Sequence, residues 1–269
     1  MNGWADADDL RRKFAFDSHH SQTTLGLGGT RTANRQMVDL ASEMAQLWTS
    51  LGPPIPGFGR VISFVSATPG EGASTIAREF ANFAAERVKR NVWLVELDVP
   101  ATSQARAFVE ERTRYGPLGR EAAASPDGSA FFVVQPAMRG PDGRPWPNGR
   151  YLAAHRVADR RLWVTRFRRE LMRPGQTVRV VSSGDYWAAL RKHADLVVID
   201  CPAASNSRAA LLVAPFADDT VLVAAADRGD LTRTGLLRDS IISAGGRCAG
   251  VVYNRTPAEP HRFLKARLP

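Results

Sequence analysis

Residues 64–77 read FVSATPGEGASTIA, and this stretch decides the fold. The apolar run 61–65 predicts a buried strand, and Ala73-Ser74-Thr75 opens a helix with apolar residues along one side. A glycine-rich turn lies between them. Strand, glycine-rich turn and helix in this order are typical of a phosphate-binding loop, because glycines let backbone N–H groups turn inward and a helix N-terminus favours an anion.

One position departs from this pattern. A phosphate-binding loop carries Lys directly before its Ser/Thr pair, where the ammonium contacts the β- and γ-phosphates. Here that position is Ala73. The sequence therefore predicts a nucleotide-binding scaffold without its main side-chain cation, and a strand–turn–helix that binds no ligand is the alternative.

Composition limits the class of protein. The chain has 269 residues, 44% of them hydrophobic, and a net charge of +9, which is enough for a substantial core. Its two cysteines, Cys201 and Cys248, lie in apolar strand-like contexts and predict no disulfide framework. We find no secretory signal and no run of about 20 apolar residues. These features predict a cytoplasmic protein that reaches the inner membrane only through a partner or charge.

The chain divides into three parts. Residues 1–35 predict a disordered tail, 36–258 a P-loop domain with an insert at about 131–173, and 259–269 a basic tail. Apolar residues at helical spacing over 37–51 predict an amphipathic helix before the core. This helix either packs on the domain or forms an oligomer contact.

Two further strands end in carboxylates. The run 91–95 leads into Glu96 and Asp98, which we expect to point the same way because they are two residues apart. The near-continuous apolar run 194–200 ends in Asp200, and this is the Walker B pattern, in which the carboxylate supports Mg²⁺. Strand ends of this kind line the ligand crevice of an open α/β sheet.

An arginine-rich segment lies between these strands. Residues 139–179 hold 11 arginines against three acids, a local charge of +8. Two β-like runs, 151–157 and 161–167, predict a hairpin with one basic face. Interleaved aromatic residues allow three interpretations: a solvated face, a dock for an acidic protein or anionic lipid, or a nucleic-acid surface.

Two more buried strands, TVLVAAA at 220–226 and GVVY at 250–253, are joined by a helix at about 231–243. Residues 101–130 predict a helix and a loose polar connection, followed by a strand at 131–134. The fold class is therefore α/β: a P-loop NTPase-like, doubly wound, mostly parallel sheet with helices on both faces and an arginine-rich β-hairpin insert.

Taken together, the motifs FVSATPGEGASTIA, LVELDVP, LVVIDCPA and GVVYNR resemble those of the bacterial tyrosine kinase family and its MinD/ParA-type relatives, over about residues 38–256. The resemblance implies ATP or ADP with Mg²⁺, held weakly if at all. It implies cofactor contacts from Pro69, Gly70, Glu71, Gly72, Ala73, Ser74, Thr75, Asn254 and Arg255, metal contacts from Ser74, Asp98 and Asp200, and catalytic candidates Glu96, Asp98 and Asp200.

The chain also departs from this family. Ala73 replaces the loop Lys, and Glu96 replaces the first Asp of the second carboxylate motif. The family's oligomerising helix carries Glu and then two Arg at three-residue steps, whereas here Glu43 is followed by Gln46 and Thr49. No Tyr follows Tyr253, so a phospho-acceptor tail is missing from this sequence, and the insert has no counterpart that we can match.

The resemblance with these departures implies a pseudokinase that regulates exopolysaccharide, capsule or holdfast biosynthesis or export. Its expected partner is an integral-membrane polysaccharide co-polymerase, the chain-length regulator, with a homo-oligomer as a further option. One alternative is an active ATPase or tyrosine autokinase in which an Arg replaces the missing Lys. Another is a ParA-like nucleic-acid or surface-binding module, although nucleic acid is the less favoured partner.

Overall fold

The structure is a computed structural model that describes residues 40–54, 57–99 and 101–255. Its longest sheet is built from β1 (Arg60–Ser66), β2 (Val92–Glu96), β3 (Leu118–Ala123), β5 (Leu152–Val157), β6 (Leu162–Phe167), β8 (Leu196–Asp200), β9 (Asp219–Ala225) and β10 (Cys248–Asn254). The predicted tails at 1–35 and 259–269 lie outside the described residues.

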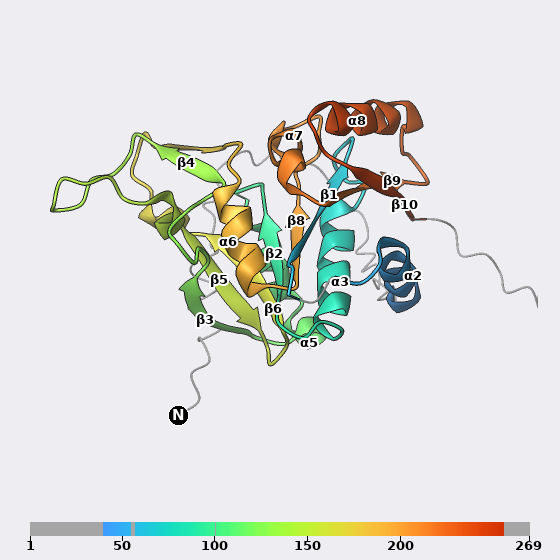
Figure 1. Ribbon diagram of the computed structural model, residues 1–269, viewed down its shortest axis with the longest axis horizontal. Helices are drawn as coiled ribbons and strands as arrows, with labels where there is room; N and C mark the ends of the chain where they lie inside the picture. The colour runs from blue at the N-terminus through green and yellow to red at the C-terminus, as the bar shows by residue number, and fades with distance from the viewer. Residues whose placement is uncertain (1–39, 55–56, 100, 256–269) are drawn as a thin grey trace, which may run out of the picture.

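The eight strands follow the order β10-β9-β1-β8-β2-β6-β5-β3 (Figure 1). Among these described strands β5 runs against all the others, because it pairs antiparallel with both β6 and β3 while the remaining pairs are parallel. The predicted α/β fold with a mostly parallel sheet is confirmed.

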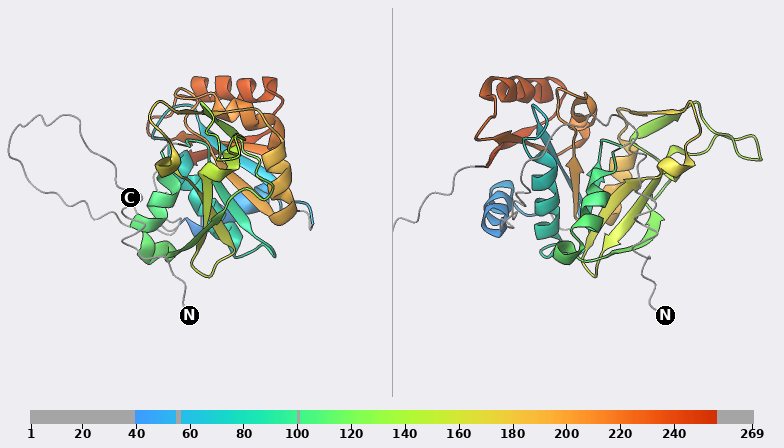
Figure 2. Two further views of the ribbon diagram at one scale, coloured as in Figure 1. Left: turned by 90° about the vertical axis from the view of Figure 1, so that its left-hand side faces the viewer. Right: turned by 180° about the vertical axis from the view of Figure 1, so that it is seen from behind.

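Helices cover both faces of the sheet (Figure 1, Figure 2). One face carries α2 (Ala41–Leu51), α3 (Ala73–Ala85), α4 (Ser103–Glu110) and α5 (Arg112–Tyr115), and the other carries α6 (Asp185–His193), α7 (Ala209–Val213) and α8 (Leu231–Ser243). Strands β1 and β8 are mostly apolar because each is buried from both sides, although β1 also buries Ser63 and Ser66.

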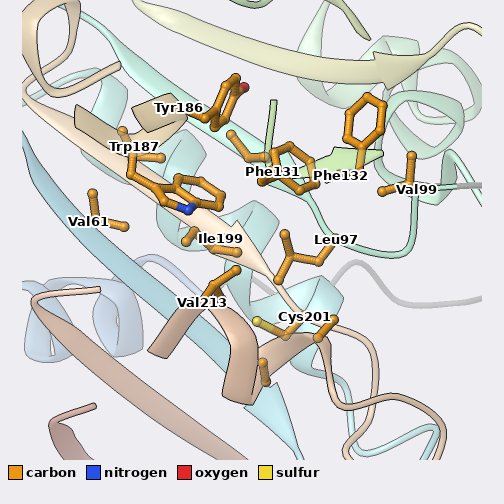
Figure 3. Close-up of a cluster of buried hydrophobic side chains, with 14 of the residues drawn as sticks. Val61, Leu97, Val99, Phe131, Phe132, Tyr186, Trp187, Ile199, Cys201 and Val213 are labelled. Carbon is orange, nitrogen blue, oxygen red and sulfur yellow. The ribbon is translucent and has the colours of Figure 1, made fainter. Parts of the chain in front are cut away.

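Each face has its own apolar cluster. On the α6 side, the rings of Phe131 and Trp187 stack with centroids 5.3 Å apart, and Tyr186 meets Phe131 edge-on (Figure 3). On the α3 side, Phe80 packs against Phe64 of β1 with centroids 5.4 Å apart. These contacts fix the helices against the sheet, and so they set where each strand–helix turn lies.

The arginine-rich hairpin forms as predicted, with β5 and β6 antiparallel, but β6 also pairs in parallel with β2 and extends the central sheet. The prediction of one basic face is wrong. Arg156 lies opposite Trp163 and Arg166 lies opposite Ala153, and this register places the two arginines on opposite faces. Arg156 is exposed, whereas Arg166 is only 2% exposed. Its guanidinium pairs with Glu121 at 2.6 Å and Glu170 at 2.7 Å.

Two strands lie outside this sheet. The strand predicted at 131–134 is β4 (Phe132–Gln135), and it pairs antiparallel with β7 (Thr177–Val180) in a separate two-stranded sheet. The segment predicted as a helix and loose connection contains α4, α5 and also β3. None of the helices in the described ranges has the length and apolar character needed to cross a bilayer.

Candidate functional site

The phosphate loop joins the carboxyl end of β1 to α3, as its motif predicts. Gly70 and Gly72 have φ of 80° and 99°, a region that side chains with a Cβ rarely adopt. A Cβ on Gly72 would lie 2.0 Å from the side-chain nitrogen of Asn254, which donates to the Glu71 carbonyl at 3.0 Å. The predicted cofactor residue Asn254 is therefore in contact with the loop.

Asp200 lies beside this loop at the end of β8, in register with Phe64 of β1. The hydroxyl of Ser74 donates to its Oδ1 at 3.0 Å, and Gln104 Nε2 donates to its Oδ2 at 2.6 Å and to the Ser74 carbonyl at 2.9 Å. Arg78 donates to Gln104 Oε1 at 3.2 Å, which orients the amide so that its nitrogen faces Asp200. The predicted pair of Ser74 and Asp200 is thus brought together across 126 residues of sequence.

Burial changes the protonation of Asp200. The side chain is 3% exposed, and this desolvation raises its pKa to about 6, against the opposing effect of hydrogen bonds from Gln104 and Ser74. A nearby cation would stabilise the ionised form of this buried carboxylate. Hydroxyl and carboxylate oxygens suit Mg²⁺, so Ser74 and Asp200 fit the metal of a bound nucleotide.

Metal binding at this point needs further oxygens. In the part of the chain that the structure describes, no three His, Cys, Asp or Glu side chains gather as a metal site. Magnesium commonly keeps waters and takes phosphate oxygens beside one or two carboxylates. The residues here fit that kind of site and do not form a cage of their own.

Glu96 ends β2 and is buried next to this network. Its carboxylate accepts hydrogen bonds from the backbone nitrogens of Ser103 at 2.9 Å and Gln104 at 3.1 Å, and also from the Ser103 hydroxyl. Both oxygens therefore cap the N-terminus of α4 and hold Gln104 in place. Burial, together with the smaller effect of the Asp200 charge, raises the pKa of Glu96 to about 8, against the opposing effect of the hydrogen bonds from Ser103 and Gln104.

Asp98 lies in a different environment from Glu96, because it is exposed whereas Glu96 is buried, although the charge of Asp98 also raises the pKa of Asp200. The expectation that Glu96 and Asp98 point the same way stays a prediction. Strand β2 ends at Glu96, and the alternation of side chains does not continue into the turn. Asp98 is exposed and lines a cavity of about 470 Å³ together with Arg179 and Arg208. Partial burial raises its pKa. Within the described residues no hydrogen bond joins Asp98 to Ser74, so the role of Asp98 toward a metal stays a prediction.

Ala73 is 5% exposed at the first position of α3 and carries no charge to the loop. Two guanidinium groups lie at the loop instead. Arg228 donates to the Gly70 carbonyl at 2.5 Å and Arg255 donates to the same oxygen at 2.8 Å. Sequence reasoning named Arg255 but missed Arg228, whose position just after β9, at the crevice end of a parallel strand, was the available signal.

Glu71 places a carboxylate inside the loop. It is 1% exposed, its Oε2 accepts from the backbone nitrogen of Thr68 at 2.9 Å, and its Oε1 has no hydrogen-bond partner among the described residues. The loop is therefore braced from within by an acid and from outside by Asn254 and two arginines. Pro69 and Thr75 belong to the same segment and complete the predicted cofactor set.

Comparison with known proteins supports the fold. No family model and no curated protein matches the sequence. Among solved structures, the chimerical protein CapA2B2 is similar with a TM-score of 0.54 and 17% identity, covering 83% of this chain and 88% of that one. The kinase domain of Escherichia coli tyrosine kinase ETK has a TM-score of 0.51 and 13% identity, covering 90% and 86%.

The VpsO kinase domain has a TM-score of 0.50 and 17% identity, covering 81% of this chain and 95% of that one. At these identities the likeness shows the fold alone. The expected resemblance to bacterial tyrosine kinases is confirmed at that level: the chain has a kinase-like, P-loop α/β fold.

The buried acids predict a pH dependence of stability. Unfolded Glu96 loses its proton near pH 4.5 and folded Glu96 near pH 8, so between these values the folded state binds more protons. The free energy of unfolding should therefore fall as pH rises through that window. Glu96→Gln should flatten the fall, as measured by urea unfolding at several pH values.

Glu110→Gln, an exposed change at the far end of the helix that Glu96 caps, is the control and should keep the wild-type slope. An unchanged slope in Glu96→Gln would show that Glu96 is already ionised in the folded protein.

Proposed function

We propose that the chain is a pseudokinase: a P-loop protein that binds Mg²⁺–ATP weakly, does not turn it over, and regulates exopolysaccharide, capsule or holdfast assembly by docking a membrane partner. One observation carries this proposal. Ala73 occupies the position of the phosphate-gripping Lys, while the network of Ser74, Gln104 and Asp200 beside it is complete.

Magnitudes favour weak binding over catalysis. A charge-assisted contact from one Lys to phosphate contributes about 1.5–3 kcal/mol, so its absence lowers affinity about 10- to 100-fold. The loop backbone, the α3 N-terminus and a metal at Ser74 and Asp200 would still favour phosphate. Phosphoryl transfer suffers more, because charge on the transferring group must be stabilised in the transition state.

The exposed face of α2 differs from the oligomerising helix of the bacterial tyrosine kinase family. Glu43, Gln46 and Thr49 are exposed at three-residue steps, and none of them is basic. Ser42 donates to Glu43, and Thr49 donates to the carbonyl of Ala45 within the same helix. The two arginines implied by the family pattern have no counterpart on this surface, so the proposed role is contact with another protein and not the oligomer that the family's helix forms.

A second candidate function is an active ATPase or autokinase that uses a substitute arginine. Arg228 and Arg255 favour it, because both guanidinium groups reach the phosphate loop. Both guanidinium groups donate hydrogen bonds to the Gly70 carbonyl, and that of Arg255 also lies 3.8 Å from the Asp227 carboxylate. A catalytic role would require one of them to leave these contacts for the nucleotide.

The first prediction from this proposal concerns turnover. Calorimetry with ATP and Mg²⁺ should show weak binding, while a phosphate-release assay should give the same background rate for the wild type and for Asp200→Asn. The reason is that Ala73 supplies no cation at the position from which a Lys would stabilise the transferring phosphoryl group. Steady release that Asp200→Asn abolishes would contradict the proposal, and loss of that release in Arg228→Gln or Arg255→Gln would establish the second candidate.

The second prediction restores the missing cation. Ala73→Lys should raise the affinity for Mg²⁺–ATP about 10- to 100-fold, since it returns one charge-assisted phosphate contact. Ala73→Met, of similar length and uncharged, is the matched control. Both variants should keep the wild-type unfolding midpoint. If they then bind Mg²⁺–ATP with equal affinity, a bound phosphate does not lie within reach of position 73.

The third prediction concerns the partner. The tagged full chain, isolated from membranes of its native host, should retain an integral-membrane polysaccharide co-polymerase, and retention should survive Asp200→Asn because docking does not require turnover. Recovery of the chain with no such protein, in both detergent-solubilised and cross-linked samples, would reject this part of the proposal and leave nucleotide binding untouched.

A further inference from the structure

A basic basin lies at the end of the central sheet opposite the phosphate loop. It has a volume of about 530 Å³ and is lined by Lys89, Arg90, Asn91, Arg156, Arg161, Trp163, Lys192 and His193. These residues come from the α3–β2 turn, the two sides of the β5–β6 turn and the end of α6, at the lower end of the sheet in Figure 1. The phosphate loop follows the carboxyl end of β1, so the two places are separated by the length of the strands.

The basin concentrates positive charge. Five of its eight lining side chains are Lys or Arg, and none of the eight is acidic. The neighbouring Asp195 is 8% exposed and pairs with Arg90 at 2.6 Å, which compensates that arginine. Glu86 lies 3.9 Å from Arg160, outside the lining. Four cations of the lining therefore have no carboxylate partner within the described residues.

Neutral carbonyls orient two of these cations. Arg156 donates from Nε to the Arg160 carbonyl at 2.8 Å and from Nη2 to the Asp159 carbonyl at 3.1 Å. Arg161 donates from Nη1 to the Val88 carbonyl at 3.1 Å. Such contacts fix the guanidinium planes without neutralising their charge. Oriented guanidinium groups are suited to bidentate contacts with phosphate oxygens.

An indole forms one wall of the basin. Trp163 is half-buried and stacks on Trp93 with ring centroids 5.6 Å apart and an interplanar angle of 12°. The parallel pairing of β2 and β6 places these two residues side by side, and so the Trp163 ring is fixed. A rigid aromatic edge beside several cations suits a ligand that has an anionic end and a ring or apolar portion.

We propose that the basic basin binds a phosphate ester, with the phosphate held by Arg156, Arg161 and the two lysines, and the remainder of the ligand against Trp163. Like charges gathered in one cleft repel each other, and the cleft walls focus their field, so an anion relieves the repulsion. A soluble phosphate ester and an anionic lipid headgroup share this chemistry. The site does not depend on nucleotide at the phosphate loop.

The test uses the full chain with two probes: inorganic pyrophosphate, in EDTA to suppress metal-dependent binding at the phosphate loop, and phosphatidylcholine vesicles with or without phosphatidylglycerol. The double variant Arg156→Glu/Arg161→Glu should lose about tenfold or more in affinity for each probe that the wild type binds. Arg144→Glu/Arg238→Glu changes two exposed arginines elsewhere by the same charge and should bind as the wild type does.

Binding of pyrophosphate alone would support a soluble phosphate ligand, and binding only to phosphatidylglycerol vesicles would support a lipid headgroup. Equal affinities of the basin variant and the control variant for a probe would overturn the proposal. Binding of pyrophosphate that is lost in Ser74→Glu but kept in the basin variant would also overturn it. Failure of the wild type to bind either probe, or binding of duplex DNA alone, would also overturn it. If the double reversal unfolds, Arg156→Gln/Arg161→Gln gives the same comparison.

Discussion

The arrangement of the candidate site depends on a buried carboxylate, that of Asp200, whose direct hydrogen-bond donors are both uncharged. Asp200 ends β8 and is met by the Ser74 hydroxyl from α3 and the Gln104 amide from α4, so one side chain ties a strand to two helices. Taking a carboxylate out of water is costly unless its oxygens are satisfied. The guanidinium of Arg78 is held one step away through Gln104, and it favours the charged form from there.

The same constraint explains Glu96. Its two oxygens are occupied by the start of α4, and this places Gln104 against Asp200. Two buried acids therefore lie close together, each with a pKa raised by burial, and with no Lys at position 73 to offset them. A site of this kind favours protons or a divalent cation. The phosphate-loop scaffold is present and position 73 carries no charge, and the proposed pseudokinase role rests on this combination.

Features that depend on local sequence could be predicted, whereas contacts between distant segments could not. The loop, its glycines and the strand ending in Asp200 could be predicted, because periodicity and spacing define them. Gln104 could not be predicted, because a Gln on a helix carries no motif and its role appears only when the start of α4 lies beside Asp200 at the end of β8. The hairpin was predictable, but its face was not: the register set by its turn separates Arg156 from Arg166.

The proposed pseudokinase holds nucleotide without consuming it. The most direct measurement is thermal unfolding of the full chain over a series of ATP concentrations with Mg²⁺, followed by analysis of the nucleotide recovered from each sample. A ligand that binds only the folded state raises the midpoint as its concentration exceeds Kd. A midpoint that rises at high ATP with the nucleotide recovered as ATP is the predicted result, and recovery as ADP in multiples of the protein concentration would contradict it.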